Sequence, residues 1–262
     1  MLRRRIGVLI LVAIAISLPC RPAKPAAILE DVIEEMYAIE PTTKISIRND
    51  DGSIFIYGAD TKEMKIEAIK RAYNPERLAK ISVNISVRPG DVSIETQHPP
   101  SPKWGWSDRS GTVDYIIVLP WTCDISRLEL GNGEVLVDGM RGRNVHVNLG
   151  NGRLFGHNCF SHLQVSVARG GLDIDYDWWE THRFSVDAQI VNGNARASIP
   201  GDAAFHLSAA SVNGHVASDF TEKENRRQDL VSNIDMSIGG ASEAEVKIRA
   251  INGSVKIAEA NP

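Results

Sequence analysis

The chain is poor in cysteine and has no excess of positive charge, and each shortage excludes a class of protein. Its 262 residues include only three cysteines, Cys20, Cys123 and Cys159. Three are too few for a disulfide framework, and no Cys-x-x-Cys or Cys/His pair has the spacing of a metal site. The formal net charge of −4 offers no basic patch for nucleic acid or an anionic membrane.

Catalytic and metal-binding patterns are also lacking. The seven histidines show no metal-ligand spacing, and no Gly-x-Ser-x-Gly motif is present. Asp173, Asp175 and Asp177 alternate along one expected strand. They fit a solvated strand face better than a calcium site, because the tandem spacing of calcium-binding β-rolls is missing. The sequence therefore predicts a protein that is not an enzyme and needs no metal or other cofactor.

Long apolar runs are absent except near the N-terminus. Three arginines at positions 3–5 precede the apolar stretch 6–18, which is too short for a comfortable membrane span and fits an export signal. We expect residues 1–26 to be a signal peptide and residues 27–262 to form one domain in the periplasm, on the outer surface or secreted. Two alternatives remain, an uncleaved anchor and lipidation at Cys20, and in either case only this segment would contact a membrane.

Glycine-containing turns recur through the rest of the chain. Most neighbouring turns are about 20 residues apart, which is typical of a repeat architecture. The turn glycines are Gly52, Gly90, Gly111, Gly133, Gly152, Gly170, Gly193, Gly214 and Gly253. Apolar residues occupy every second position on both sides of each turn, as in Leu128 and Leu130 before Gly133 and Val135 and Val137 after it. This alternation predicts half-buried β-strands in a fixed register.

Two all-β architectures can use this pattern. In an elongated β-solenoid, each turn is a corner, and coils of about 20 residues stack in parallel. In a β-sandwich, each Asn-Gly turn closes a hairpin. The recurrence of asparagine at one turn position favours the solenoid, because equivalent side chains can bond as a ladder. That asparagine set is Asn132, Asn151, Asn192, Asn213 and Asn252. The solenoid predicts that Asn132 and Asn151 lie one strand spacing apart.

The interruptions of the repeat indicate loops and ends. Residues 98–111 contain three prolines and two tryptophans and predict a loop or seam. Residues 177–183 predict an insertion at one coil edge, and the charged stretch 221–229 predicts a solvated loop. Residues 32–38 alternate weakly and are expected to be a strand. Cys123 and Cys159 are nearly two coils apart, about 9 to 10 Å if stacked, so we expect no disulfide between them.

The sequence resembles the bacterial putative-adhesin domain family of unknown function, whose members are exported β-solenoid-like proteins. The matching stretches are IRNDDGSIFIYGAD (47–60), VDYIIVLP (113–120), LELGNGEVLVDGMRGRNVHVNLGNG (128–152) and INGSVKI (251–257). The resemblance covers nearly the whole chain after the export signal. It implies a stacked-strand fold outside the cytoplasm and supplies no catalytic residues.

Aromatic residues concentrated outside the regular repeat are the candidate binding site. These residues are Trp104, Trp106, Tyr176, Trp178 and Trp179. Exposed tryptophan and tyrosine are favoured at recognition surfaces, but the same residues could cap the stack. The predicted function is adhesion or scaffolding through a cell-surface protein or a glycan. The alternative is a carbohydrate-binding or carbohydrate-active β-helix protein that uses the tryptophan loops.

Overall fold

The protein is described by a computed structural model over residues 27–99, 111–222, 232–240 and 242–260. The expected signal segment with Cys20, the loop residues Trp104 and Trp106, and most of stretch 221–229 lie outside these described residues. The strands in chain order are β1 (Leu29–Ala38), β2 (Lys44–Ala59), β3 (Glu63–Ala72), β4 (Ser82–Arg88), β5 (Asp91–Gln97), β6 (Thr112–Pro120), β7 (Asp124–Asp138), β8 (Asn144–His157), β9 (His162–Asp175), β10 (Ser185–Pro200), β11 (Phe205–Asn213), β12 (Val216–Ser218), β13 (Asn233–Ile238), β14 (Glu245–Asn252) and β15 (Val255–Ala260).

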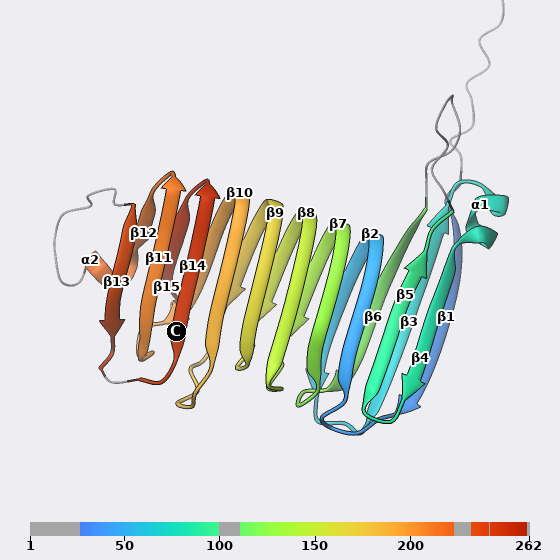
Figure 1. The fold of residues 1–262 in the computed structure, drawn as a ribbon, viewed down its shortest axis with the longest axis horizontal. Helices are drawn as coiled ribbons and strands as arrows, with labels where there is room; N and C mark the ends of the chain where they lie inside the picture. Colours follow the sequence, from blue (N-terminus) through green and yellow to red (C-terminus); the bar gives the residue numbers. More distant parts are fainter. Residues whose placement is uncertain (1–26, 100–110, 223–231, 241, 261–262) are drawn as a thin grey trace, which may run out of the picture.

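All fifteen strands belong to one mixed sheet, which confirms the all-β class. Its main path runs β1-β3-β6-β2-β7-β8-β9-β10-β14-β11-β13 (Figure 1). Parallel pairing continues without a break from β2 through β7, β8, β9, β10 and β14 to β11. Two short helices, α1 (Pro75–Lys80) and α2 (Asp219–Glu222), lie at the ends of the molecule. Within the described ranges, neither has the length or apolar character to span a membrane.

The long strands bend at their glycines, and the change in side-chain parity shows why. In β7, Leu128 and Leu130 precede the glycine at even positions, whereas Val135 and Val137 follow it at odd positions. In a flat strand, these two pairs would point to opposite faces of the sheet. All four are buried in one core, so the strand turns over at Gly133 and encloses the apolar side chains. Figure 1 shows this bend repeated along the sheet.

Glycine is required at these bends for two reasons. Gly133, Gly152 and Gly170 have φ angles of 136°, 136° and 134°, which L residues rarely adopt. They also stack directly on one another. A Cβ atom on Gly152 would lie 1.7 Å from the carbonyl oxygen of Gly133, and one on Gly170 would lie 1.7 Å from that of Gly152. Neighbouring strands can therefore approach this closely at the bends only because the residue at each bend is a glycine.

The turn asparagines form the predicted ladder. Asn132 and Asn151 are register partners on β7 and β8, and Asn151 Nδ2 donates to Asn132 Oδ1 at 2.9 Å. At the other end of the stack, Asn252 Nδ2 donates to Asn192 Oδ1 at 3.0 Å, and Asn213 Nδ2 donates to Asn252 Oδ1 at 2.8 Å. The prediction that Asn132 and Asn151 lie one strand apart is confirmed.

The ends of the sheet depart from the expected parallel stacking. Strand β3 pairs antiparallel with β1 and β6, and β11 pairs antiparallel with β13. Gly90 was predicted to be a repeat turn like the others, and this was wrong. It has a φ of 73° in the hairpin between β4 and β5, and no atom lies within 4 Å of a Cβ added there. A strand at the end of a stacked array has a neighbour on one side only. Its pairing can therefore be antiparallel without disturbing the parallel strands in the middle.

The order of strands also departs from the order of the chain. Strand β14 lies between β10 and β11, although β11 precedes it in sequence. The long spacing between Gly214 and Gly253 therefore includes a return of the chain into the stack. Strand β1 confirms that residues 32–38 are extended.

Candidate functional site

The connections at the strand ends, away from the glycine bends, stack into a second ladder. The amide of Arg141 donates to the carbonyl of Trp121 at 2.7 Å, and that of Phe160 donates to Met140 at 2.9 Å. The amide of Asn158 donates to the carbonyl of Asp175 at 2.9 Å. Successive loops are thus fixed to their neighbours by backbone bonds, which makes this edge a rigid platform for side chains.

Three side chains from three of these loops form a stack that we call the Trp–Arg–Trp stack. The guanidinium carbon of Arg141 lies 5.1 Å from the ring centroid of Trp121 and 6.0 Å from that of Trp178. Trp121 is 37% exposed and Trp178 is 46% exposed. Arginine over an aromatic face is a favourable cation–π contact, so the two rings are held in place while part of each remains in contact with solvent.

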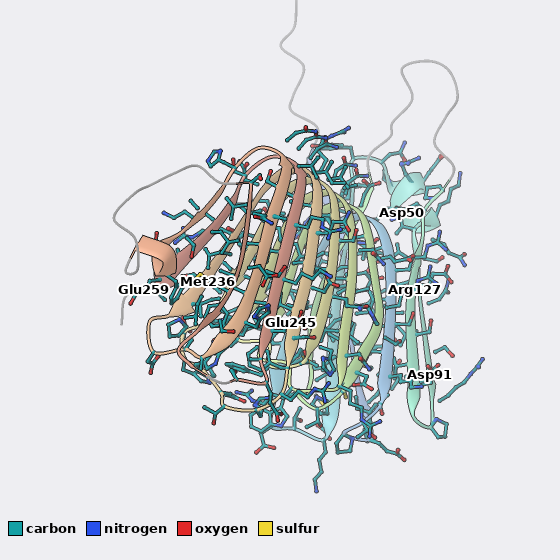
Figure 2. All side chains as sticks on the ribbon, turned by 60° about the vertical axis from the view of Figure 1, so that its left-hand side comes forward. Asp50, Asp91, Arg127, Met236, Glu245 and Glu259 are labelled. Carbon is teal, nitrogen blue, oxygen red and sulfur yellow. The ribbon has the colours of Figure 1, made fainter. Side chains whose placement is uncertain are left out.

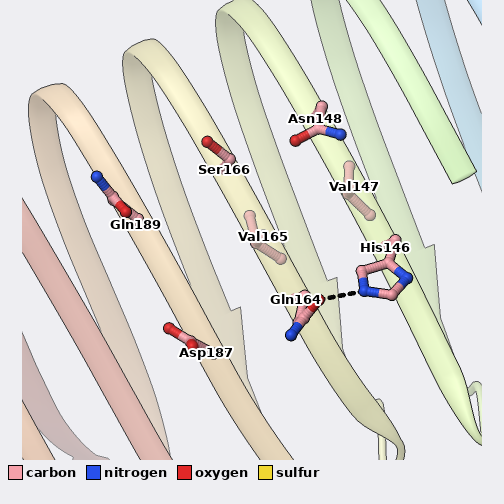
Figure 3. A pocket seen from close by; sticks show the side chains of 8 residues that line it. All are labelled: His146, Val147, Asn148, Gln164, Val165, Ser166, Asp187 and Gln189. Carbon is pink, nitrogen blue, oxygen red and sulfur yellow. Dashed lines mark hydrogen bonds between the residues drawn. The ribbon is translucent and has the colours of Figure 1, made fainter.

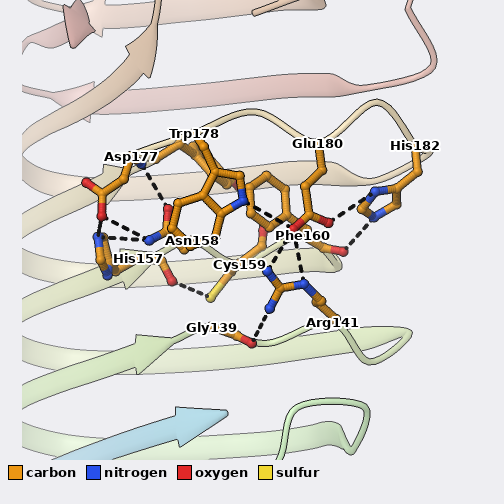
Figure 4. Close-up of polar contacts among 11 residues, drawn as sticks. Gly139, Arg141, His157, Asn158, Cys159, Phe160, Asp177, Trp178, Glu180 and His182 are labelled. Atoms are coloured by element: carbon orange, nitrogen blue, oxygen red, sulfur yellow. Dashed lines mark hydrogen bonds and ion pairs between the residues drawn. The ribbon is translucent and has the colours of Figure 1, made fainter. Parts of the chain in front are cut away.

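Arg141 is neutralised within the stack. Its Nε and Nη2 atoms donate to Glu180 Oε1 at 3.1 and 2.7 Å, and its Nη1 donates to the carbonyl of Gly139 at 3.2 Å (Figure 4). Trp178 Nε1 contacts the same oxygen of Glu180 at 3.3 Å. With its charge paired, Arg141 positions the rings and is poorly suited to capture an anion.

A polar network beside the stack fixes the loop that carries Trp178. Among the described residues other than glycine, Asn158 alone has a positive φ, of 48°. Its Oδ1 accepts from the amide of Asp177 at 2.9 Å. His157 lies between two carboxylates, with Nδ1 at 2.9 Å from Asp138 and Nε2 at 3.0 Å from Asp177. Asparagine tolerates the left-handed conformation, so Asn158 can turn the chain and anchor the next loop.

Two of the predicted binding residues pack against one another and toward the core. Tyr176 is buried, and its hydroxyl donates to the carbonyl of Cys159 at 2.9 Å. Trp179 packs against the core, and its Nε1 donates to the carbonyl of Ala204 at 3.1 Å. Both rings contact Phe184, at centroid distances of 5.9 and 5.0 Å. The prediction that Tyr176 is an exposed binding residue is wrong, because its ring is buried among aromatic side chains of the core, whereas Trp179 is only partly buried.

Trp178 is the predicted residue that stays at the surface, and it is joined there by two residues that sequence reasoning missed. Trp121 and Arg141 lie in the regular repeat, where no insertion marks them. Sequence reasoning could have found this pair from its spacing, because Trp121 and Arg141 are separated by about one repeat length. Residues at that spacing lie on neighbouring loops along one edge of the sheet. Trp104 and Trp106 lie outside the described residues.

The outer face made by the first halves of the long strands carries an open polar groove. It is lined by His146, Asn148, Gln164, Ser166, Asp187 and Gln189 (Figure 3). His146 bonds to Gln164, and nearby His162 Nδ1 lies 2.8 Å from Ser185 Oγ. Polar side chains project along this whole face, including the labelled Asp91, Arg127 and Glu245 (Figure 2). Over the described part of the chain, no three His, Cys, Asp or Glu residues are grouped to hold a metal ion.

Burial raises the pKa of one carboxyl and two thiol groups near the loop edge. Asp175 lies partly buried beside Asp173, and burial, followed by repulsion from Asp173, raises the pKa of its carboxyl. Burial raises the pKa of the Cys159 thiol to about 12 and that of Cys123 to about 11. Both thiols are free and buried. Cys159 Sγ donates to the carbonyl of Val137 at 3.2 Å, so neither cysteine is placed as a surface nucleophile.

The fold is that of an all-β protein built from bent strands that pair in parallel, and a solved structure shares it. The chain matches a putative cell adhesion protein from Clostridium sporogenes with a TM-score of 0.51 and 20% identity, over 87% of this chain and 100% of that one. A putative adhesin from Bacteroides fragilis aligns over 87% of this chain and 97% of that chain, with a TM-score of 0.28 and 9% identity. No protein-family model and no curated protein matches the chain. The resemblance to putative adhesins is confirmed at the level of the fold.

Proposed function

We propose that this chain is an exported, non-enzymatic protein of the adhesin type, built as a β-solenoid and used for adhesion or scaffolding. The solenoid is supported by strand–bend–strand units that pair in parallel, with glycine packed on glycine and asparagine bonded to asparagine. The fold shared with a putative cell adhesion protein supports the type of function. Such a scaffold presents an extended, rigid surface on which loops can act.

The observation that carries the proposal is the Trp–Arg–Trp stack. Its rings stay partly exposed although Arg141, Phe160 and Glu180 hold them in position. Rigid aromatic side chains lose little entropy on binding and are enriched among residues that dominate interface energies. The polar groups around the stack bond to one another, which supports a contact surface rather than a reaction site. The expected partner is a cell-surface protein or a glycan.

Binding to cells and to extracted glycans should be measured for Trp121→Ala and Trp178→Ala. Each should lose at least about tenfold in affinity, because a central aromatic anchor contributes about 2 kcal/mol or more. The control is Val212→Ala, which truncates a 67% exposed side chain on strand β11. Unchanged binding per folded molecule in both tryptophan variants would refute the stack as the site.

The same experiment separates the two candidate functions. Binding to purified glycans that is lost in Trp178→Ala would favour the carbohydrate-binding alternative. A cleaved glycan product would overturn the non-enzymatic proposal. Binding to cells that survives removal of glycans but not the Trp178→Ala change would identify a protein partner.

A further inference from the structure

The two outer faces of the bent sheet differ in chemical character. On the face with the open groove, outward positions in register across five successive strands are polar. They are Arg48, Glu129, Asn148, Ser166 and Gln189. This is the expected result of period-2 alternation, in which one side of each strand contacts the core and the other contacts water.

On the opposite face, four neighbouring strands place large apolar side chains outward in a single register row. This apolar row consists of Ile116, Phe55, Leu136 and Phe155, on β6, β2, β7 and β8. Ile116 is 36% exposed, and the other three are partly exposed. Val118 and Tyr57 are paired in the next outward row. The row extends about 14 Å from β6 to β8. Its neighbours in the same register, Asp173 on β9 and Arg196 on β10, are charged.

Such a surface requires an explanation. Isolated apolar residues on a protein surface are ordinary, but a contiguous patch marks a contact site. Here the core on the inner side of the same strands is already complete, with Ile54, Ile56 and Val135 fully buried. The apolar row therefore adds nothing to the core of this chain, and its natural role is to contact another surface.

We propose that the apolar row is the contact surface of a two-fold symmetric homodimer. The two-fold axis lies parallel to the strands, midway between β2 and β7. This operation brings Phe55 over the partner's Leu136, and Ile116 over the partner's Phe155. A two-fold interface uses the same patch on both copies, so a row that is apolar on both sides of its centre is self-complementary.

The charges beside the apolar row agree with this symmetry. Lys65 on β3 is in register with Val118, and the axis places it opposite the partner's Asp175 on β9. Asp114 on β6, which pairs with Arg71 of its own chain, is likewise placed opposite the partner's Arg153 on β8, whose guanidinium lies 4.9 Å from the Phe155 ring centroid of its own chain. One pair, Glu67 and the partner's Asp173, has like charges, but each Asp173 is bridged by Arg153 of its own chain at 3.3 Å. Opposed charges at the rim of an apolar patch favour one orientation of two surfaces.

The environment of Asp175 fits a cation from the second copy. Burial and the neighbouring Asp173 raise the pKa of Asp175 in the single chain. A lysine from the partner would favour the ionised carboxylate and offset the repulsion between the two aspartates.

The available area is sufficient for a modest dimer. The two-fold axis matches six strands of one copy, β3, β6, β2, β7, β8 and β9, with the same six strands of the other. Six strands about 4.8 Å apart and three outward rows give roughly 600 Å² per copy, or about 1,200 Å² in total. This lies at the lower end of specific interfaces, so we expect a dissociation constant in the micromolar range.

The oligomeric state should be measured by sedimentation equilibrium from about 1 to 100 µM. The sample should be the mature protein as purified from cells. We expect a reversible monomer–dimer equilibrium. Leu136→Glu should raise the dissociation constant at least about 100-fold, because each dimer would bury two unpaired carboxylates. Asn148→Glu adds the same charge to the polar face and should leave it unchanged.

A charge exchange tests the orientation even if Leu136→Glu fails to fold. Lys65→Glu and Asp175→Lys should each weaken the dimer about tenfold, and the double variant should regain most of that loss, since the pair is restored in reverse. A monomer at 100 µM, a dimer insensitive to Leu136→Glu, or no recovery in the double variant would overturn the proposal. Binding of the apolar row to phosphatidylcholine vesicles without self-association would assign it to a lipid surface instead and would also overturn it.

Discussion

Replacement of Gly152 by alanine should destabilise the stack by about 2 to 5 kcal/mol. The first contribution is conformational, because a φ of 136° costs an L residue about 1 to 3 kcal/mol. The second is steric. The new Cβ would lie 1.7 Å from the carbonyl oxygen of Gly133, whereas ordinary contact begins near 3.4 Å. The β7 and β8 bends would have to separate, losing one or two hydrogen bonds of about 1 kcal/mol each.

Gly90→Ala is the matched control for this change. Gly90 also has a positive φ, of 73°, but no atom lies within 4 Å of the added Cβ. This variant should lose only the conformational contribution, about 1 to 2 kcal/mol. The difference between the two variants therefore measures the close approach of the bends.

Urea denaturation followed by circular dichroism gives the comparison, supported by hydrogen exchange because repeat arrays can unfold in parts. Exchange should accelerate most in β7 and β8 of Gly152→Ala and only near the β4–β5 hairpin in Gly90→Ala. If the two variants shift the midpoint equally, or if exchange in β7 and β8 is unchanged, the argument from stacked glycines is refuted.

Four other features of the structure can be tested by substitution, thiol chemistry or a change of pH. Asn151→Ala should cost about 1 kcal/mol in the free energy of unfolding, since it removes the 2.9 Å bond to Asn132, and urea midpoints equal to wild type would contradict the ladder as a stabilising element. Tyr176→Phe should cost about 1 to 2 kcal/mol because it leaves the carbonyl of Cys159 without its 2.9 Å partner, whereas Trp178→Phe at the surface should change thermal stability little. Both thiols should resist a thiol reagent in the native state and react after denaturation without reductant, and early reaction would contradict their burial. Because the Cys159 pKa is raised from 9.0 to about 12, its contribution to stability is complete below pH 9 and is lost as pH rises toward 12, which pH-dependent urea midpoints of wild type and Cys159→Ala can measure.

Local patterns in the sequence predicted much of the fold. Alternation of apolar residues on both sides of Gly133 and Gly152 predicted strands with a single register, and the recurrence of asparagine predicted the bonded ladder. These features depend on side-chain period and on turn chemistry, which neighbouring residues specify. The same reasoning predicted a strand over residues 32–38 and an insertion at 177–183.

Which side chains meet was decided by the tertiary structure. The position of β14 between β10 and β11, the antiparallel ends and the hairpin at Gly90 depend on how distant segments pair, which no local pattern specifies. Tyr176 and Trp179 face inward because Phe160, Phe184 and Phe205 leave a space that they fill. The Trp–Arg–Trp stack and the apolar row exist because strand pairing brings distant residues together, such as Phe55 and Leu136 or Arg141 and Trp178. Local sequence specifies the repeating unit of strand, bend and strand, and the pairing of these units across the sheet created both surfaces.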